Sequence, residues 1–406
     1  MRVPTGNTCL SSETTLNLNS YVKTVLVSPG ATNVASGTNL QNALTTATTG
    51  TLIKLEPGTY DLGTTHLTMT QGVDLEGSGE GLTTITSQVV RGSSSNTSGT
   101  VVITNSSEIR FLTIANNGTT TSKAAVYGNG VDKTAKLTNV TISVSGGGNS
   151  SYGINNNGTA SPTIKNVTIT VSGGSNDFGI SNFSSSSPHI QNVTVTAGSS
   201  TNSVVGINND TVSSPIIQNS NVTVTGGNQN FGILTSNNSA PAIQNSIITS
   251  SGSNTNTGIY NASNTAAFLI MNSTISVSGG NIGNGILNTS SSPIIQNVII
   301  TVSASGQTNG IFNNANSNAA IRNSTISVSG GGANIGIAIT LNSALVILNS
   351  SVSASGGGNG NSSISVNNGG SAKVGNSQLT GAVFGSPYTC VGDYDDNFVA
   401  LGAACV

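Results

Sequence analysis

Residues 291–314 read SSPIIQNVIITVSASGQTNGIFNN, and the pattern of this stretch recurs along most of the chain. Its first mark is an apolar residue, any residue, an asparagine and then an alternating strand. Its second mark is a Gly-Ile dipeptide, as at Gly310-Ile311. Both marks return every 25 to 27 residues, and two independent marks that keep one period indicate a repeat architecture.

The asparagine mark explains how the chain could bend. A sharp corner between two strands needs a residue in the left-handed conformation, which asparagine adopts at low cost. We therefore predict a structural ladder of stacked asparagines, with buried side chains at Asn139, Asn166 and Asn192. The ladder positions are Asn139, Asn166, Asn192, Asn219, Asn245, Asn272, Asn297, Asn323, Asn349 and Asn376.

The period selects the fold class. Short alternating strands without 3.6-residue periodicity exclude a helical repeat, and about 26 residues accommodate three short strands and three turns. The prediction is an all-β, right-handed parallel β-helix whose coils lie about 4.8 Å apart. IRFLTI at 109–114 looks like a further coil with Phe111 in the asparagine place.

The ends of the stack are expected to be capped. Thr38-Asn39-Leu40-Gln41 reads as the capping box of a short helix. The expected domains are an N-terminal extension with a capping helix (1–60), the parallel β-helix (61–385) and a C-terminal hairpin cap (386–406).

Composition excludes several functions. Only 6% of the 406 residues are charged and the formal net charge is −2, so nucleic-acid binding has no electrostatic basis. No apolar run approaches the roughly 20 residues that span a bilayer. The first residues, MRVPTGNTCLSS, lack the apolar core of a signal peptide, so we expect a removed leader or another export route.

Cysteine usage favours an oxidising compartment. Cys390 and Cys405 lie close together near the C-terminal end, and we predict that they form a disulfide; two free thiols are the alternative. Cys9 is then unpaired or bonds another chain.

The chain resembles a known superfamily at both ends and in its repeats. IKLEPGTYDLG (53–63) and GVDLEGSGEGLTTI (72–85) resemble the opening coils of the pectate-lyase-like superfamily. The repeats resemble those of uncharacterised bacterial secreted right-handed β-helix repeat proteins, and CVGDYDDNFVALGAAC (390–405) is similar to their C-terminal cap. The resemblance implies the fold and a secreted or cell-surface location, but this fold carries lyases, hydrolases, esterases and adhesins alike.

Enzymes of that superfamily use carboxylates, often with calcium, beside Arg or Lys on one sheet. Between Lys136 and Gly392 the only acids are Asp177 and Asp210, which we do not expect to share a substrate. His66 and His189 lack catalytic partners. GDYDDN (392–397) could hold calcium or form a solvated turn. We predict no catalytic residue, metal or cofactor; acidic groups gathered on one outer patch would overturn this interpretation.

Three files of residues could act as surfaces. Leu234, Tyr260, Leu287 and Phe312 follow the Gly-Ile marks of four consecutive repeats, and we predict a partner-binding apolar stripe, unless a neighbouring turn covers it. A glutamine file (Gln191, Gln218, Gln244 and Gln296) reads as an amide ladder or a ligand surface. A double file of Ser and Thr reads as ordinary sheet or as an ice-binding face.

The expected function is a non-enzymatic extracellular structural or adhesive protein. Its expected partner is itself or a surface glycan. As a homo-oligomer or filament, it is expected to assemble side by side through the apolar stripe or end to end through residues 10–27. The alternatives are a carbohydrate-binding or polysaccharide-degrading β-helix protein and an ice-binding solenoid.

Overall fold

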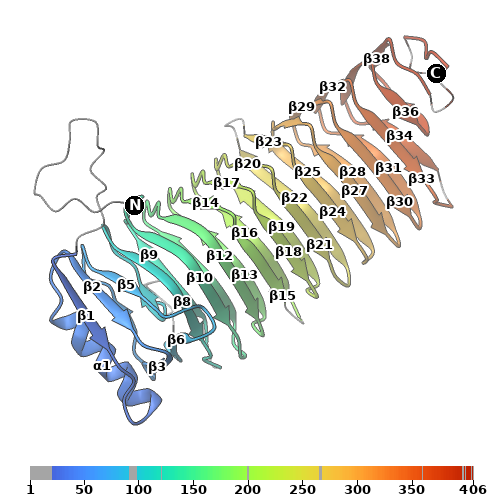
Figure 1. Cartoon of the computed structure of the whole chain (residues 1–406). Coiled ribbons are helices and arrows are strands. Elements are labelled where there is room, and N and C mark those ends of the chain that lie inside the picture. Colours follow the sequence, from blue (N-terminus) through green and yellow to red (C-terminus); the bar gives the residue numbers. More distant parts are fainter. Residues whose placement is uncertain are drawn as a thin grey trace, which may run out of the picture.

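The computed structural model describes residues 21–90, 98–119, 121–198, 201–264, 268–358, 360–395, 397, 399–403 and 405. The chain winds into one elongated solenoid, with the N-terminal coils at one end and the C-terminal coils at the other (Figure 1). Every pairing between successive coils is parallel, and the third strands form a continuous 13-stranded sheet. The predicted right-handed parallel β-helix is confirmed.

A coil has three strand positions, called first, second and third here in chain order. The first strands are β2 (Thr51–Leu55), β5 (Asp74–Glu76), β14 (His189–Gln191), β17 (Ile216–Gln218), β20 (Ala242–Gln244), β23 (Leu269–Met271), β26 (Ile294–Gln296), β29 (Asn318–Arg322), β32 (Ala344–Leu348), β35 (Ser371–Gly375) and β38 (Tyr388–Val391). The second strands are β3 (Gly58–Asp61), β6 (Thr83–Ser87), β15 (Thr194–Gly198), β18 (Asn221–Thr225), β21 (Ile247–Ser251), β24 (Thr274–Ser278), β27 (Ile299–Ala304), β30 (Thr325–Gly330), β33 (Ser351–Ser355) and β36 (Gln378–Thr380).

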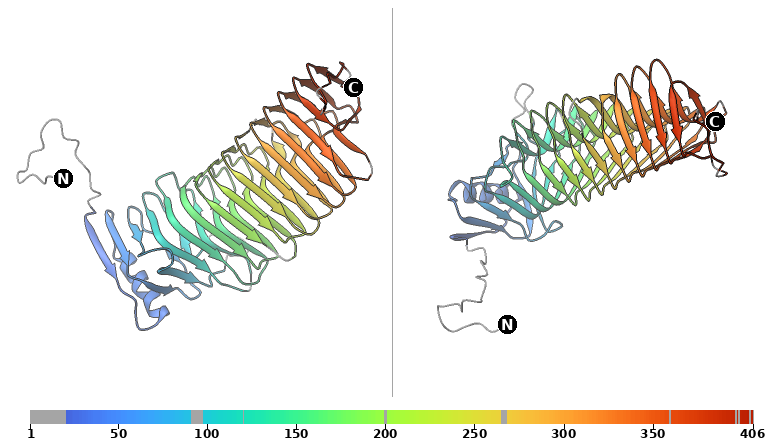
Figure 2. Two further views of the ribbon diagram at one scale, coloured as in Figure 1. Left: turned by 45° about the vertical axis from the view of Figure 1, so that its right-hand side comes forward. Right: turned by 90° about the horizontal axis from the view of Figure 1, so that it is seen from above.

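In three coils one strand runs through both positions: β8 (Glu108–Asn116), β10 (Lys136–Val144) and β12 (Thr163–Ser172). The third strands are β4 (Leu67–Thr68), β7 (Val101–Val102), β9 (Lys123–Asn129), β11 (Ser150–Asn157), β13 (Asn176–Asn182), β16 (Ser203–Asn209), β19 (Gln229–Ser236), β22 (Thr255–Asn264), β25 (Ile282–Ser291), β28 (Gln307–Asn314), β31 (Ala333–Ile339), β34 (Asn361–Val366) and β37 (Ala382–Gly385). The further views show the coils stacked along one axis (Figure 2).

The core is a set of apolar columns. Alternation along each strand turns every second side chain inward, as in β14 and β17, where Ile190 and Ile217 are fully buried and paired in register. The isoleucine of each Gly-Ile dipeptide is also fully buried, for example Ile207 and Ile233. Each coil thus buries its apolar side against its neighbours, which is how a 406-residue chain avoids needing one compact core.

All ten ladder asparagines have the left-handed conformation, with φ between 49° and 54°, and Phe111 takes the same conformation at φ 55°. Their side chains lie outside the core, however, not inside it. Asn166 and Asn192 are exposed and Asn139 is half-buried, so the expectation that these three would be buried is wrong. The left-handed residue interrupts the alternation of the strand by one position. Gln191 points outward, Asn192 at the corner also points outward, and Val193 then points into the core.

The N-terminal end carries α1 (Asn33–Thr45) and the edge strand β1 (Lys23–Val27), which pairs with β2. The helix begins five residues before the expected capping box, because Thr32 is the N-cap and its Oγ1 accepts a hydrogen bond from the Ala35 amide at 3.1 Å. Leu40 and Leu44 cover the core. Gly37 faces β3 so closely that a Cβ there would lie 2.0 Å from the Asp61 carbonyl oxygen.

At the other end, Cys390 and Cys405 are joined by a disulfide with their Cα atoms 5.3 Å apart. Tyr394 pairs in parallel with Gln378 and antiparallel with Ala400, which closes the last coil. Cys9 and residues 10–20 lie outside the described residues. In the part of the chain that is described, no helix is long and apolar enough to cross a membrane.

Candidate functional site

An acidic cluster lies on the outer face of the first strands, at the N-terminal end of the solenoid. Leu75 and Ile109 are fully buried, so alternation turns Asp74 and Glu76 of β5, and Glu108 and Arg110 of β8, away from the core. Glu76 pairs in register with Arg110, and Lys54 of β2 pairs with Glu76. Neighbouring coils therefore place three carboxylates and two cations side by side.

Arg110 holds the cluster together. Its Nε and Nη2 each lie 2.9 Å from Glu76 Oε2, its Nη1 lies 3.0 Å from Glu108 Oε2, and the same Nη1 lies 3.7 Å from Asp74 Oδ2. Only 13% of the Arg110 side chain is exposed, so these pairs are shielded from bulk solvent better than surface ion pairs are. Burial would lower the pKa of Arg110, but hydrogen bonds with Tyr21 and Glu76 and the neighbouring charges raise it above its ordinary value.

Glu76 is the structural member of the cluster. Its Oε1 lies 3.2 Å from Lys54 Nζ, and its Oε2 accepts hydrogen bonds from Arg110. Burial would raise the pKa of Glu76, but the hydrogen bonds from Arg110 and Lys54 outweigh burial and hold the pKa below its ordinary value. Glu76 is therefore a fixed anion that anchors Arg110.

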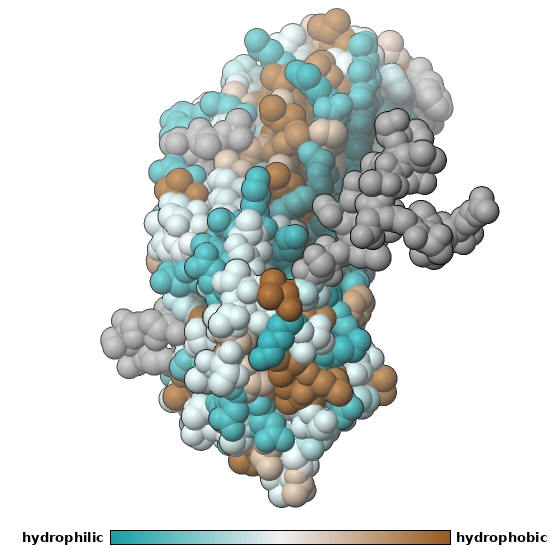
Figure 3. Space-filling model, turned by 60° about the vertical axis from the view of Figure 1, so that its left-hand side comes forward, coloured by the Kyte–Doolittle hydropathy of each residue, from teal (hydrophilic) through white to brown (hydrophobic). Residues whose placement is uncertain are grey.

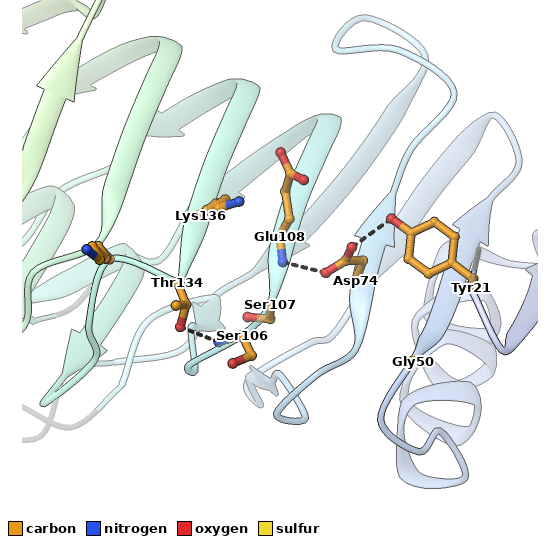
Figure 4. Close-up of a pocket in the computed structure, with 9 residues that line it drawn as sticks. Tyr21, Gly50, Asp74, Ser106, Ser107, Glu108, Thr134 and Lys136 are labelled. Atoms are coloured by element: carbon orange, nitrogen blue, oxygen red, sulfur yellow. Dashed lines mark hydrogen bonds between the residues drawn. The ribbon is translucent and has the colours of Figure 1, made fainter. Parts of the chain in front are cut away.

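Tyr21 reaches the cluster from the segment that precedes β1. Its hydroxyl donates to Asp74 Oδ2 at 2.7 Å (Figure 4). The same hydroxyl accepts from Arg110 Nη2 at 2.9 Å. Burial of the phenol, and then its hydrogen bond to Asp74, raise the pKa of Tyr21 above 10.0. The hydroxyl thus keeps its proton near neutral pH and orients the Asp74 carboxylate, whose Oδ1 accepts the Glu108 amide at 2.8 Å.

A hollow of about 740 Å³ opens beside these groups. Figure 4 shows Asp74, Glu108 and Lys136 coming from three successive coils. Glu108 and Lys136 pair in register, so an anion and a cation alternate along the wall. The lining residues are Tyr21, Gly50, Asp74, Ser106, Ser107, Glu108, Lys133, Thr134 and Lys136.

The arrangement suits acid–base chemistry on an oxygen-rich substrate. Asp74 Oδ2 and Glu108 Oε2 both approach one nitrogen of Arg110, so they lie no farther apart than the carboxyl pairs that cleave glycosidic bonds, about 5 to 10 Å. About a fifth of each side chain is exposed, 21% for Asp74 and 23% for Glu108, which lets both face the hollow.

Sequence reasoning missed this cluster because it searched for acids only between Lys136 and Gly392. The signal was present in two short strands, Asp74-Leu75-Glu76 and Glu108-Ile109-Arg110, where alternation places every charged residue outward. Asp74 and Glu108 are 34 residues apart, which exceeds the 26-residue period. The repeat pattern alone therefore does not place Glu108 in register with Asp74.

The acids that the sequence did single out lie elsewhere. Asp210 lies at a corner, where its Oδ1 is 2.6 Å from Asn237 Nδ2 and 3.0 Å from the Ser236 hydroxyl. Asp177 is fully buried. They do not share a surface. His189 Nε2 lies 3.3 Å from the Oε1 atom of Gln218, which belongs to the glutamine file.

Asp177 belongs to an internal charged column. Lys123, Ser151 and Asp177 pair in register on three consecutive coils, and all three are buried. Lys123 Nζ donates to the carbonyl oxygens of Gly118 at 2.7 Å and Gly146 at 2.8 Å. Burial raises the pKa of Asp177 to about 6, opposed by the Gly174 amide, Ser151 and Lys123. Burial likewise lowers the pKa of Lys123.

Two acids of the C-terminal GDYDDN stretch, Asp393 and Asp395, accept hydrogen bonds from backbone amides. Asp393 is buried, and its carboxylate accepts the amides of Ser377 at 2.7 Å and Val391 at 2.9 Å. Asp395 Oδ1 accepts the amides of Asn397 and Val399. Within the described residues, no group of three or more His, Cys, Asp or Glu side chains is placed to hold a metal ion.

The predicted apolar stripe is continuous in space. Leu234, Tyr260, Leu287 and Phe312 pair in register on four consecutive third strands, and each is half-buried. The Tyr260 ring also stacks on Phe231, with centroids 5.7 Å apart. Partner binding by this stripe stays a prediction.

No protein-family model matches the chain, and no curated protein matches it either. Solved structures share its fold. The A-module of the Azotobacter vinelandii mannuronan C-5 epimerase AlgE4 aligns with a TM-score of 0.48 and 15% identity, over 91% of this chain and 97% of that chain. A GH87 α-1,3-glucanase catalytic domain aligns at 0.44 and 16%, over 91% and 69%. DFA-IIIase from Arthrobacter chlorophenolicus A6 aligns at 0.39 and 11%, over 87% and 93%.

These likenesses are likenesses of fold and give no residue correspondence. The chain itself has a right-handed parallel β-helix fold.

Two expectations are corrected here: that the protein is a non-enzymatic structural or adhesive rod, and that it is not an enzyme. The solved structures that align with the chain carry the names of an epimerase, glucanases, a DFA-IIIase and an alginate lyase. The structure also contains the feature that was expected to overturn the non-enzymatic interpretation, since Asp74, Glu76 and Glu108 gather on one outer patch.

Proposed function

We propose that the protein is a carbohydrate-active enzyme that cleaves a polysaccharide at the N-terminal hollow. The observation that carries the proposal is the placement of Asp74 and Glu108 around one nitrogen of Arg110, at the wall of an open cavity. A long, open, polar face suits a polymer better than a small apolar ligand, which would be enclosed by apolar walls.

Each residue has a distinct part in the proposal. Glu108 serves as the acid–base group, because its carboxylate has one ion-pair partner, Arg110, and faces the hollow beside Lys136. Asp74 serves as the second carboxyl group, oriented by the Tyr21 hydroxyl and the Glu108 amide. Arg110 keeps both carboxylates in position, and Lys136 supplies a cation for charge that develops on the substrate.

We also propose that the protein works outside the cell. The disulfide between Cys390 and Cys405 supports this, because disulfides persist in oxidising compartments.

The test is the release of new chain ends from a panel of neutral and acidic polysaccharides, comparing the wild type with Glu108→Gln and Asp74→Asn. We expect the wild type to cleave at least one polymer and each variant to lose about a hundredfold or more in kcat/KM, since a positioned acid–base group contributes about that much. Asp210→Asn is the matched control, because Asp210 lies at a distant corner with hydrogen-bonded neighbours of its own.

Melting temperatures separate catalysis from folding. Glu108→Gln keeps the amide that binds Asp74 and the buried Ile109, so its melting temperature should stay near that of the wild type. No cleavage of any polymer by the wild type, or equal cleavage by wild type and Glu108→Gln, would show that the cluster only stabilises the first coils.

A further inference from the structure

The outer face of the first strands carries two rows beyond the hollow. The aliphatic row is defined by Ile216, Ala242, Leu269, Ile294, Ala320 and Val346, which pair in register from one coil to the next. The amide row is defined by Gln191, Gln218, Gln244 and Gln296, with Met271 in the same file. The two rows lie two residues apart on the same strands.

The aliphatic row faces solvent. Ile216 is 43% exposed, Ile294 40% and Val346 39%, whereas the residue that follows each of them is buried. Five coil spacings separate Ile216 from Val346, about 24 Å along the axis. Figure 3 shows the apolar surface of one side of the molecule as separate patches among polar surface, not as one broad face.

The row is continuous with the proposed active site. Glu108 pairs with Lys136, Lys136 with Thr163, Thr163 with His189, and His189 with Ile216. Four coil spacings, about 19 Å, separate the strand of Glu108 from that of Ile216. A linear ligand that leaves the hollow along the axis would therefore reach the aliphatic row.

The amide row keeps hydrogen-bonding groups for a ligand. Gln218 Nε2 donates to Gln244 Oε1 at 3.1 Å, but within the described part of the chain the side chains of Gln191 and Gln296 form no hydrogen bond. The ladder is thus incomplete. From Ile216 to Gln296 these strands present neither an acid nor a base outward, and the next charge is Arg322.

The shape argues against a protein partner. A stable protein interface covers about 800 Å² on each side and has breadth in two directions, whereas the aliphatic row is one side chain wide and runs beside a file made mostly of glutamine amides. Its combination of a narrow apolar strip and parallel amides matches a sugar chain, which has C–H faces and hydroxyl edges. Burying a carboxylate on the strip would cost free energy, so a neutral chain fits it better.

We propose that the aliphatic row and the amide row form a binding track for a neutral stretch of the polysaccharide, distal to the cleavage site. This inference rests on the proposed function and adds to it the direction of the bound chain and the chemistry of its distal sugars.

The test measures binding to the Glu108→Gln protein, which prevents turnover, with soluble neutral β-1,4-linked glucose oligosaccharides of two to eight units. We expect affinity to rise with length until the chain reaches Ile216. The double variant I216S/I294S should lose about tenfold in affinity for the longest oligosaccharides and nothing for the shortest. The same oligosaccharides oxidised to carboxylates at C6 should bind the unaltered track more weakly at the longest lengths.

The matched control is I247S/I299S. Ile247 and Ile299 are 50% and 52% exposed, but they lie on second strands, across the asparagine corner, so this variant should bind like the parent. If I216S/I294S binds long and short chains as the parent does while Glu108→Gln still abolishes cleavage, the track is wrong and the active site stands. If I216S/I294S changes only the sedimentation of the protein, the row is a protein contact and the track is wrong.

If no polysaccharide is cleaved and none of the oligosaccharides binds, the proposed function and the track fail together.

Discussion

Single residues with a left-handed backbone set the corners of this solenoid. Ten asparagines share φ values near 50°, and every one follows a first-strand position. Two features of asparagine could account for its use there: tolerance of the left-handed conformation, and side-chain hydrogen bonds along the ladder, such as Asn166 Nδ2 to Asn139 Oδ1 at 3.0 Å. Substitutions can separate the two.

Asn219 is the position for this prediction, because its φ is 50° and its side chain forms no hydrogen bond among the described residues. We expect Asn219→Ala to lower the free energy of unfolding by about 1 kcal/mol, because alanine adopts the left-handed conformation less readily than asparagine does. Asn219→Gly should stay within about 0.5 kcal/mol of the wild type. Urea denaturation measures both; equal losses in the two variants would show that conformation is not what selects asparagine.

Asp177 makes stability depend on pH. Its folded pKa, about 6, lies above its ordinary value of 3.8, because the buried carboxylate is costly to ionise. The stability that Asp177 contributes is therefore complete below about pH 4 and is lost as the pH rises through about 6. The predicted loss is on the order of 2 to 3 kcal/mol.

Thermal melts between pH 4 and pH 7 test this against Asp177→Asn, which stays neutral at every pH. The wild type should lose stability relative to the variant over that interval. Parallel curves for the two proteins would mean that Lys123 compensates the carboxylate fully in the folded state.

Asparagine conformation was predictable from the sequence, but side-chain exposure was not. The regular spacing of Asn219 and the other ladder asparagines predicts the corner, since few residue types adopt the left-handed conformation at low cost. Spacing does not reveal that the corner adds an outward position, because that depends on how two strands meet. The burial of Asp177 was not predictable either. A single acid in the sequence is typical of an exposed turn, and only the strand register shows that Asp177 lies in a column with Lys123 and Ser151.

At the scale of elements, a serine ladder connects the coils inside the asparagine corners. The amide of Ser220 donates to the hydroxyl of Ser246, and that of Ser246 to Ser273, each at 3.2 Å. The same contact joins Ser324 to Ser350 and then Ser350 to Ser377. The serine hydroxyl of the next coil thus accepts the hydrogen bond of a buried corner amide. That amide therefore needs no carbonyl acceptor in a neighbouring strand.

Asp393 ends this ladder, since its Oδ1 accepts the Ser377 amide where a further coil would place a serine. We expect Asp393→Ala to lower the free energy of unfolding by about 1 to 3 kcal/mol, because the buried Ser377 amide and the Val391 amide lose their acceptor. Asp393→Asn keeps a carbonyl oxygen and should lose less. Chemical denaturation with the disulfide intact measures the difference; a wild-type value for Asp393→Ala would contradict a capping role.

At the scale of the whole molecule, the regular coils build a long frame and the first coils contain the proposed active site. The repeat made the frame predictable, because identical coils must stack their apolar positions. The site was not predictable from the repeat, since Asp74 and Glu108 lie in coils that depart from its period. The pairing of β5 with β8 brings Asp74 to Glu108 and Arg110.

Hydrogen–deuterium exchange of the Glu108→Gln protein, with and without a polysaccharide that the wild type cleaves, locates the site most directly. The account predicts slower exchange in β5, in β8 and in the turn at residues 106–107 when the polymer is bound. Protection confined to the third strands, or to coils beyond β30, would contradict the placement of the active site at the N-terminal hollow.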